Sequence, residues 1–564
     1  MREKIKTIIE GAIAGLGKIP DFSIEIPSDK KFGDYSSNVA FFLGKKTGAD
    51  TRKMAEEIKA KINSDLFSKI EVAGPGFINF FIADKFFTDN LKKIGKNYGK
   101  NSELKNKKVI IDYTDPNPFK EFHIGHLMSN AIGEFLSRIF EFQGAKLKRV
   151  CYQGDVGMHV AKAIWGMAEL IKHASEIYKE DRIVGVDRWG TAYKMGAAAF
   201  EVNGDAKKEI IEINKKVFDK SDVKINKLYA EGKELSLKHF DKIYKKLDTR
   251  FDYFIFESQV LETGKKIVEA GLKKGIFEKG DNGAIIFKGE KYGLHTRVFI
   301  NSEGLPTYES KDLGLAQVKY NKYKYDQSVV ITANEQSDYF KVMLCAMSKV
   351  LPKLAEKTKH IGHGMLRLPE GKMSSRTGKV ITGESLIEQV EEFIKEKIKD
   401  RELSEKEKKE ISEQVAIGAI RYSILKQSIG SDIIYDFDKS ISFEGDSGPY
   451  LQYSYARAES VLRKAKVEKT KPSFKKIPNQ ITDLEKKMYH FPEIVLQAGN
   501  NYEPHFLVLY LTELAGVFNS YYGSNKIVDK KDEYSPYKVA LAQAFVTIMK
   551  NGLWMLGIKA PKKM

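Results

Sequence analysis

The strongest constraint on the fold is a pair of apolar runs on either side of a helix. The first run, KVIIDY (108–113), is almost continuously apolar, as expected of a strand buried in a parallel sheet. After a loop, apolar residues recur at helical spacing from about His126, and Gly144 can end that helix in the left-handed conformation. The second run, LKRVCYQ (147–153), is predicted to be another strand. This order of elements predicts the βαβ unit of a nucleotide-binding sheet.

The sequence around this unit predicts an α/β fold of three domains. Residues 1–100 read as a small α/β domain, in which EVAGPGFINFFI (71–82) is a strand with a Gly-Pro-Gly bend. Residues 101–435 are expected to form a Rossmann-type parallel-sheet domain, and residues 436–564 an all-helical domain. A helical, Lys-rich stretch at about 165–290 is predicted to be an insertion. The sheet is then expected to resume in TRVFIN (296–301), SVVITA (328–333) and HIGHGMLRL (360–368).

The net charge and the number of cysteines limit the classes of partner and of cellular compartment that fit this chain. The formal net charge of +18 suits a polyanionic partner, nucleic acid first and an acidic membrane surface second, although a Lys-rich proteome gives the same composition. The two cysteines, Cys151 and Cys345, cannot make a disulfide framework or a CxxC zinc site, so we expect a cytoplasmic protein. No run approaches the roughly 20 apolar residues of a membrane span, and no signal peptide is predicted.

The tetrapeptide HIGH (123–126) stands where the first strand gives way to the helix. A helix N-terminus offers free amides and a positive dipole to phosphate. His123 and His126 can reach a triphosphate together, and Gly125 lets the backbone approach the adenine or ribose without a side-chain clash.

The same four letters recur at 360–363. That copy lies inside a strand-like run with no helix behind it, so we interpret it as a strand segment with its two histidines on opposite faces. Met365, which comes two residues later, is expected to line an adenine pocket through backbone contacts.

The loop GKMSSRTG (371–378) is a second candidate for phosphate chemistry. It comes after a predicted strand and precedes a helix capped near Thr382. Lys372 and Arg376 can clamp the charge that develops as pyrophosphate leaves, and Ser374 lies between them. By itself, the segment could equally be a solvated basic loop.

The two segments resemble the HIGH and KMSK signatures of class I aminoacyl-tRNA synthetases. The resemblance implies that an amino acid carboxylate attacks the α-phosphorus of ATP, supplied as its Mg²⁺ complex, and that a terminal adenosine takes the acyl group on its 2′ hydroxyl. It implies catalytic roles for His123, His126 and Lys372, and no tightly bound cofactor or metal. Ser375 replaces the last signature lysine, and Lys120 is expected to supply the missing charge.

Further segments are similar to arginyl-tRNA synthetases. They are FGDYSSN (32–38), AGPGFIN (73–79), DYTDPN (112–117), YESKDLG (308–314), NEQ (334–336), FEGDSGPYLQY (443–453) and LGIKAPKKM (556–564). The resemblance runs from about residue 30 to the C-terminus and is least specific in the insertion. It implies that the chain attaches L-arginine to tRNA(Arg), and we expect it to act as a monomer.

The resemblance also implies a set of arginine-binding residues. A guanidinium is a planar cation with five donors, so its site needs carboxylate and carbonyl-type acceptors around a plane. By analogy, Asp112, Asp312 and Gln336 supply acceptors, and Tyr308 stacks on or bonds the guanidinium. Asn117 holds the α-amino or carboxyl end of the substrate. Asp112 is shorter than the Glu that the family usually has, and each residue alone could have a purely structural role.

Contacts to tRNA are implied at both ends of the chain. The N-terminal domain of the family reads the D-loop, for which Phe77, Asn79 and Tyr35 are the candidates, with an aromatic stacking on a splayed base and an amide bonding its edge. The C-terminal domain holds the anticodon, and its candidate residues are Tyr450, Tyr453, Arg457, Tyr522 and Met564.

Three alternatives stay open at this point. The arginyl-type segments argue against a class I synthetase for another amino acid. A cysteinyl enzyme would also need zinc ligands that this chain lacks. The enzymes for large aliphatic amino acids carry a longer insertion than the one seen here. A small nucleotidyltransferase with the same signature would lack the helical C-terminal part. A non-catalytic tRNA-binding paralogue is disfavoured because His123, His126 and Lys372 are all present.

Overall fold

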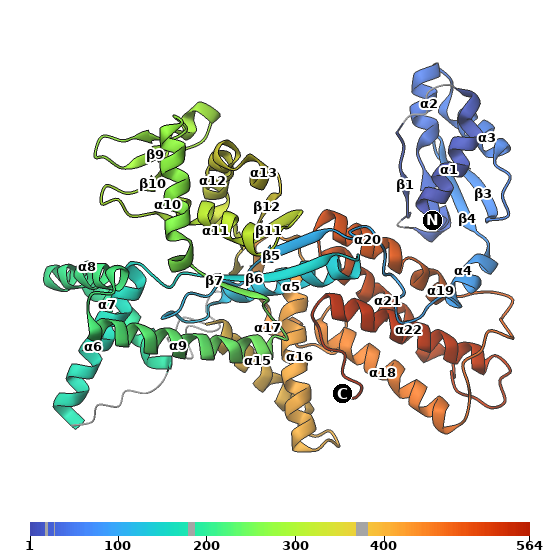
Figure 1. Cartoon of the computed structure of the whole chain (residues 1–564). Coiled ribbons are helices and arrows are strands. Elements are labelled where there is room, and N and C mark those ends of the chain that lie inside the picture. Colours follow the sequence, from blue (N-terminus) through green and yellow to red (C-terminus); the bar gives the residue numbers. More distant parts are fainter. Residues whose placement is uncertain (17–20, 28, 179–185, 368–381) are drawn as a thin grey trace. The chain divides into compact units, whose positions relative to one another are not determined.

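The computed structural model describes residues 1–16, 21–27, 29–178, 186–367 and 382–564 (Figure 1). They belong to two compact units. The smaller unit comprises Met1–Tyr98, Val461–Phe491 and Val517–Ile548, and the larger unit comprises Gly99–Ser460, Pro492–Gly516 and Met549–Met564. Both units take up parts of the C-terminal helices, so this division does not coincide with the domain borders expected at residues 100 and 435, which stay predictions.

A five-stranded parallel sheet forms the centre of the larger unit (Figure 1). In the order β12-β11-β5-β6-β7, its strands are Thr358–His363, Gln327–Ala333, Lys108–Asp112, Lys146–Gln153 and Tyr253–Phe256. The chain moves outward from β5 through β6 to β7 and then returns to the other side of β5. Ligands of open α/β sheets bind at such a reversal, outside the carboxyl ends of the strands. The predicted Rossmann-type sheet is confirmed, and its crevice lies beside Asp112, the last residue of β5.

Helix α5 (Ile124–Phe142) connects β5 to β6 and begins at the carboxyl end of β5. It packs closely on the chain just after that strand, because a Cβ built on Gly133 would lie only 2.2 Å from the Tyr113 ring. Glycine therefore permits a helix-to-strand approach that a larger residue would block. Gly144 comes after the helix with a φ of 92°, as its predicted role requires. The predicted βαβ unit is confirmed.

The opposite face of the sheet is covered by α10 (Glu257–Lys273), α11 (Tyr308–Lys322) and α12 (Ser337–Val350). Ile110 and Val150 of the sheet belong to the same buried cluster as residues of these helices. Since alternate residues of a strand point to opposite faces, the sheet strands are apolar on both sides. The first turns of helix α11 face the crevice.

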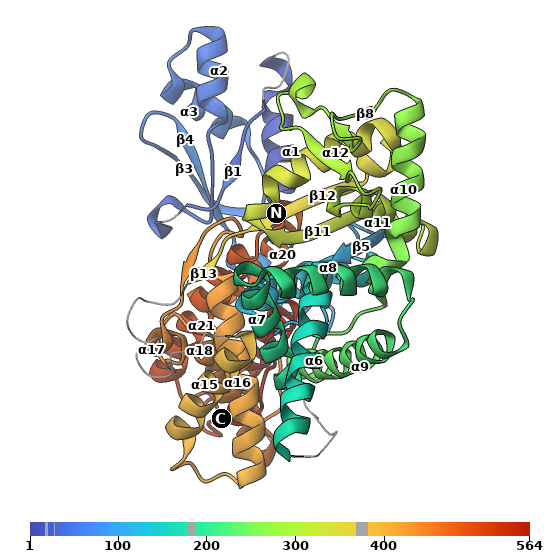
Figure 2. The same cartoon turned by 90° about the vertical axis from the view of Figure 1, so that its left-hand side faces the viewer.

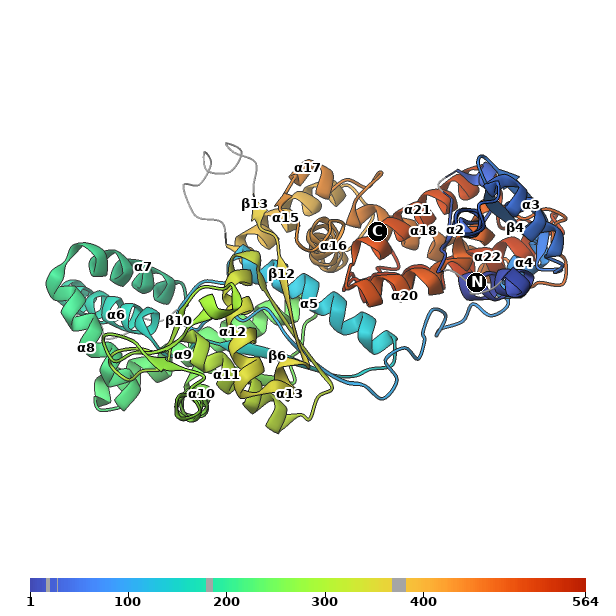
Figure 3. The same ribbon diagram turned by 90° about the horizontal axis from the view of Figure 1, so that it is seen from above.

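The predicted insertion is partly corrected by the structure. Its helices α6 (Met158–Tyr178), α7 (Val186–Val202), α8 (Gly204–Asp219) and α9 (Val223–Lys246) form one group beside the sheet (Figures 1 and 3). Strand β7, however, pairs in parallel with β6, so the sheet resumes near residue 253, inside the predicted stretch of 165–290.

The prediction that TRVFIN joins the central sheet is wrong. It forms β10 (Arg297–Ile300), which pairs with β9 (Ile285–Phe287) in a separate antiparallel sheet that also contains β8 (Glu278–Lys279). The backbone groups of β10 are satisfied by a partner strand only a short loop away, so a distant parallel partner is not needed.

The smaller unit contains a four-stranded antiparallel sheet in the order β1-β2-β4-β3. Its strands are Ile24–Glu25, Tyr35–Ser37, Phe77–Ile82 and Phe67–Ala73, and its helices include α1 (Arg2–Ile13), α2 (Val39–Thr47), α3 (Thr51–Lys61), α4 (Asp84–Leu91) and α19 (Asp483–Tyr489). The run predicted as one bent strand is two antiparallel strands, because Gly74 and Gly76 adopt φ of 52° and 142° and reverse the chain.

Beyond β12 the described chain is mostly helical. The short strands β13 (Leu366–Arg367) and β14 (Ile433–Ile434) pair in parallel. The helices are α15 (Gly383–Ile398), α16 (Glu405–Leu425), α17 (Phe437–Ser440), α18 (Gly448–Val467), α20 (Phe491–Asn501), α21 (His505–Ser524) and α22 (Ser535–Met555). Figure 2 shows α15 and α16 side by side. None of the helices in the described part of the chain is long and apolar enough to cross a bilayer.

Candidate active site

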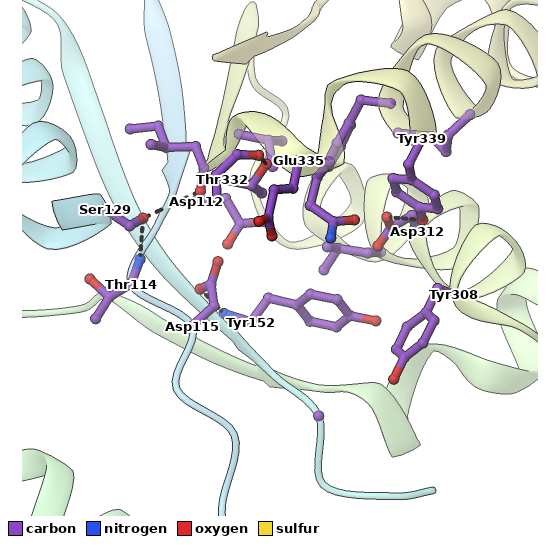
Figure 4. A pocket seen from close by; sticks show the side chains of 18 of the residues that line it. Asp112, Thr114, Asp115, Ser129, Tyr152, Tyr308, Asp312, Thr332, Glu335 and Tyr339 are labelled. Atoms are coloured by element: carbon purple, nitrogen blue, oxygen red, sulfur yellow. Dashed lines mark hydrogen bonds between the residues drawn. The ribbon is translucent and has the colours of Figure 1, made fainter. Parts of the chain in front are cut away.

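A cavity of about 700 Å³ opens at the carboxyl ends of β5 and β11, at the reversal of strand order. It brings together most of the catalytic and arginine-binding residues predicted from the sequence. Those that line it are Asp112, Asn117, His123, Gly125, His126, Tyr308, Asp312 and Gln336. Lys120 and Met365 are not among its lining residues. Figure 4 shows the acidic and aromatic part of the cavity, to which β5, β6, α11 and α12 contribute.

The histidines of the first signature form a stacked pair at the start of α5. Their ring centroids are 3.5 Å apart, and the backbone N–H of His123 donates to Nδ1 of His126 at 3.1 Å. Burial, the nearby His123 and the charge of Lys120 lower the pKa of His126 well below its usual range, and burial and Lys120 lower the pKa of His123. Both rings are therefore neutral near pH 7, and His126 carries its proton on Nε2.

Lys120 lies close enough to the histidines to act on them electrostatically. Its ammonium group lowers the pKa of both rings, and its Nζ lies 5.0 Å from the centroid of the Tyr193 ring. A Cβ on Gly125 would lie 3.1 Å from the His123 ring, so the glycine leaves room for that ring to stack.

Asp112 is the most deeply buried acid of the cavity, with 1% of its surface exposed. Its Oδ2 pairs with Nζ of Lys319 on α11 at 3.1 Å, whereas Oδ1 has no hydrogen-bond partner among the described residues. Burial raises the pKa of Asp112 despite the lysine. A buried carboxylate oxygen without a partner is costly, so this atom is poised for a ligand that donates an N–H.

A second acidic residue of the cavity, Asp312, lies on helix α11. The Tyr339 hydroxyl of α12 donates to its Oδ2 at 2.5 Å, and burial raises the pKa of Asp312 to about 7. Tyr308, at the start of α11, is 63% exposed, and Nζ of Lys311 lies 4.6 Å from its ring centroid. Gln336 ends the 3₁₀ helix η4 (Asn334–Gln336), which comes directly after β11.

Asn117 lies in the loop after β5 and is held by a hydrogen bond from the end of the neighbouring strand β6. Its Oδ1 accepts a hydrogen bond from the Gly154 N–H at 2.7 Å, just after β6. The loop that carries it is strained, since Thr114, Asp115 and Phe119 adopt positive φ of 79°, 47° and 71°. Such strain persists where surrounding contacts over-determine the backbone, and it is frequent at functional sites.

The second HIGH copy lies in strand β12, as predicted. His360 stacks on Phe340 at 3.9 Å between ring centroids, and its Nε2 lies 2.8 Å from the Thr332 hydroxyl. The N–H of Met365 donates to Asp432, and its carbonyl accepts from the Ile433 N–H. Because a carbonyl oxygen can accept two hydrogen bonds, the expected backbone contact of Met365 with adenine stays a prediction.

The loop at 371–378, with Lys372, Ser374 and Arg376, lies outside the described residues. The chain directly after it is tied to the first signature. Thr382 pairs with His123 in an antiparallel bridge, and the Gly383 N–H donates to the Phe122 carbonyl at 2.8 Å. Thr382 also caps α15 through the Ser385 N–H, as predicted. The described chain from Thr382 onward is thus anchored at the start of α5.

Two of the three predicted D-loop contacts are buried in the smaller unit. Tyr35 is fully buried, with its hydroxyl 3.3 Å from Nδ1 of His490. Asn79 is 2% exposed and its Oδ1 accepts from the Ser36 hydroxyl at 2.7 Å. Both side chains therefore belong to the core of the sheet, and their role as D-loop contacts stays a prediction. Phe77, in contrast, is 43% exposed.

The anticodon candidates on α18 share one partly exposed face. The Arg457 guanidinium lies 4.8 Å from the Tyr453 ring centroid and donates to its hydroxyl at 3.3 Å, and Tyr450 lies one turn before Tyr453. Tyr522 is 42% exposed on α21, and Met564 is the partly exposed last residue.

Several cavity residues were missed by the sequence reasoning. Lys319 lies two turns after Asp312 on the predicted helix, a spacing that could have suggested a shared face. Tyr339, Tyr152 and Asp115 carry no signal of their own, because the pairing of strands far apart in sequence places them.

Comparisons with known proteins show the family to which the chain belongs. Family models match as "tRNA synthetases class I (R), catalytic domain" over residues 89–437, as the DALR anticodon binding domain over 451–564, and as the arginyl tRNA synthetase N-terminal domain over 3–82. The arginine--tRNA ligase of Fusobacterium nucleatum is 33% identical over 549 residues, which cover 96% of this chain and 95% of that protein. That of Clostridium acetobutylicum is 31% identical, with 100% and 99% covered.

A likeness in structure accompanies the likeness in sequence. The arginyl-tRNA synthetase of Thermus thermophilus superimposes with a TM-score of 0.80 over the full length of both chains, at 22% identity, which concerns the fold. The catalytic-domain match covers more than half of the chain, and the curated relatives align nearly end to end. The chain therefore belongs to the class I arginyl-tRNA synthetases and is an arginine--tRNA ligase.

Proposed function

We propose that the cavity binds L-arginine beside ATP, forms arginyl-adenylate, and passes the arginyl group to the 2′ hydroxyl of the terminal adenosine of tRNA(Arg). The observation that carries this proposal is the presence of a buried carboxylate, Asp112, and a partly buried one, Asp312, in the same cavity as His123 and His126. A planar cation with five donors satisfies such acceptors, whereas a neutral side chain would leave them unpaired.

The stacked histidines would act on the triphosphate. As neutral rings, they offer N–H donors beside the free amides at the start of α5, where the helix dipole also favours negative charge. Lys120 would add a positive charge near them. Lys372, Ser374 and Arg376 would stabilise the charge of the leaving pyrophosphate.

The opposite wall would bind the side chain of arginine. Asp112 would accept through its unpartnered Oδ1 and Asp312 through its carboxylate, with Gln336 as a further acceptor and Tyr308 at the rim. ATP would be supplied as its Mg²⁺ complex, which is a substrate and not a resident cofactor.

We also propose the tRNA contacts, the location and the assembly state. Phe77 would stack on a D-loop base, and the Tyr453–Arg457 pair would meet the anticodon loop, as would Tyr450, Tyr522 and Met564. The net charge of +18 supports a polyanionic partner. We propose a cytoplasmic monomer.

The test is ATP–pyrophosphate exchange with each of the twenty amino acids, with and without total tRNA. We expect exchange with arginine alone and only when tRNA is added. Exchange with another amino acid would overturn the roles of Asp112, Tyr308, Asp312 and Gln336. No exchange, from folded protein that binds tRNA, would instead support a non-catalytic tRNA-binding protein.

A further inference from the structure

Helices α7 and α9 of the insertion pack against the chain just before the first signature. The ring of Trp189 on α7 meets the buried Phe119 ring edge-on, with 5.2 Å between the ring centroids. The Phe119 N–H donates to the Ser236 hydroxyl of α9 at 3.0 Å. A Cβ on Gly232 of α9 would lie 2.4 Å from the Phe119 ring, so glycine allows α9 to come this close. The insertion therefore fixes the backbone directly before Lys120.

The ammonium group of Lys120 lies over the ring of Tyr193, one turn after Trp189 on α7. Its Nζ is 5.0 Å from the ring centroid, within the range of a cation–π contact. No carboxylate of the described residues forms an ion pair with Lys120, so the ring is the partner that this part of the chain gives to the charge. Tyr193 packs in turn against the buried cluster that contains Phe119 and Trp189. The ring is thus held in place from behind.

From this position Lys120 acts on groups of the cavity. Burial is the main cause of the lowered pKa values of His123 and His126, and the charge of Lys120 adds to it. Burial also raises the pKa of Glu257, which Lys120 opposes in part. These three residues line the cavity. The ammonium group therefore lies at the side of the cavity where the triphosphate would bind, although Lys120 is not one of the lining residues.

A lysine at this place has to be oriented before it can act. Its side chain is long and flexible, and a charge stabilises a reacting group best when it is already in position. The face of an aromatic ring can orient an ammonium group without cancelling its charge, whereas a carboxylate would offset that charge.

We propose that Tyr193 is a positioning residue for adenylate formation, and that its ring holds the ammonium group of Lys120 toward the phosphates of ATP. The helical insertion would thereby contribute to the chemistry through a side chain that does not itself touch the substrate. This inference rests on the role of Lys120 in the proposed function.

The test is a double-mutant cycle on the rate of adenylate formation, measured in a single turnover of the full chain with arginine, ATP and tRNA. The variants are Tyr193→Leu, Lys120→Met and the two combined, together with Tyr193→Phe, which keeps the ring and loses only the hydroxyl. The matched control on the same helix is Lys194→Met. It removes an ion pair with Glu121 whose side chains are 60% and 40% exposed, and such pairs contribute little.

We expect Tyr193→Leu to lower the rate constant by roughly five- to tenfold, and to leave the apparent dissociation constant of arginine within about twofold. Tyr193→Phe should keep most of the rate, because the face of the ring is retained. In the chain that carries Lys120→Met, the further change Tyr193→Leu should alter the rate by less than about twofold, because the group that the ring orients is gone. Lys194→Met should stay within about twofold of the unaltered chain.

Equal losses from Tyr193→Leu with and without Lys120 would overturn the proposal, since the ring would then act through packing alone. A loss in Tyr193→Phe as large as in Tyr193→Leu would overturn it as well, because the hydroxyl would be the acting group. If Lys120→Met is impaired and Tyr193→Leu is not, the inference fails while the role of Lys120 stands. A rate unchanged by Lys120→Met would contradict that role in the proposed function, and the inference would fall with it.

Discussion

Burial shifts the protonation equilibria of single side chains in this cavity, and binding of the substrate depends on those equilibria. Asp312 is the clearest case, because its pKa of about 7 lies far above the ordinary value for an aspartate. The folded chain therefore binds a proton there more tightly than the unfolded chain does. This group favours folding most at acid pH, and that contribution is lost as the pH rises from the ordinary aspartate range through about 7.

Arginine binding should show the opposite trend at Asp312. Since the guanidinium would pair with the ionised carboxylate, a proton competes with it, and affinity should fall roughly tenfold as the pH drops from about 8 to about 6. The pKa values of His123 and His126 are lowered, so these rings gain a proton only at a lower pH than an ordinary histidine does. Calorimetric titration of arginine at several pH values measures the effect.

The matched variant for that experiment is Asp312→Asn. It should bind arginine more weakly at about pH 8 and lose the roughly tenfold dependence on pH. An unchanged slope in this variant would show that the titrating group lies elsewhere.

Some residues of the cavity can be predicted from the sequence alone, and others cannot. Asp112, Asp312 and the histidines were predicted because they stand in motifs at fixed spacings along the chain. Tyr35 and Asn79 also stand in family-like segments, yet both are buried. An aromatic or amide on a short strand points inward or outward according to register, and register depends on the partner strand.

At the scale of elements, the same four residues at 123–126 and 360–363 have two different environments. The first copy caps a helix of 19 residues, and both of its histidines line the cavity. The second copy lies in strand β12, where His363 lines the cavity and His360 stacks on Phe340. The apolar and polar letters are identical, so the difference comes from the chain on their C-terminal side, which forms a helix in one case and turns to β13 in the other.

A pair of substitutions separates the two copies. His126→Ala should lower the rate of adenylate formation by roughly a hundredfold, as is typical when an oriented donor to a developing charge is lost. His360→Ala removes a stacked ring that is not among the residues lining the cavity and should change that rate less than about threefold. Single-turnover adenylate formation, with tRNA binding as the folding check, measures both. Similar losses in the two variants would contradict the assignment of the first copy.

Element boundaries were predicted best where the apolar period is long. The helix from His126 and the strands at 108–113 and 147–153 appear close to their expected positions. Strand β7 has only four residues and comes after a long helix, so its signal is lost in the helical stretch. Run length thus decides which elements can be recognised from one sequence.

At the scale of the whole larger unit, one buried arginine joins three distant parts of the chain. Arg421 of α16 donates to the carbonyl of Gly557, to Oδ1 of Asn130 on α5 at 3.2 Å, and to the carbonyl of Leu247 at 2.6 Å. It is 1% exposed, and burial lowers its pKa to about 10. The catalytic helix, the end of the insertion and the C-terminal segment therefore share one donor.

Replacing this arginine should loosen all three attachments. Arg421→Met leaves several buried acceptors without a donor and should reduce the free energy of unfolding by about 3 kcal/mol. Arg367→Met, which removes an exposed arginine paired with Asp432, should cost less than about 1 kcal/mol. Denaturant midpoints of both variants measure the difference, and equal midpoints would argue against a structural role for the Arg421 contacts.

The acidic lining of the cavity also has a consequence for the order in which substrates arrive. The ionised fractions of Asp112 and Asp312 repel a triphosphate, so the cavity by itself is a poorer host for ATP as the pH rises through about 7, the pKa of Asp312. Once the cationic groups of arginine pair with these acids, that repulsion is removed and the triphosphate meets mainly the histidines and the start of α5. Arginine and ATP are therefore expected to bind with positive cooperativity, each tightening the other by the same factor, because linkage between two sites is reciprocal.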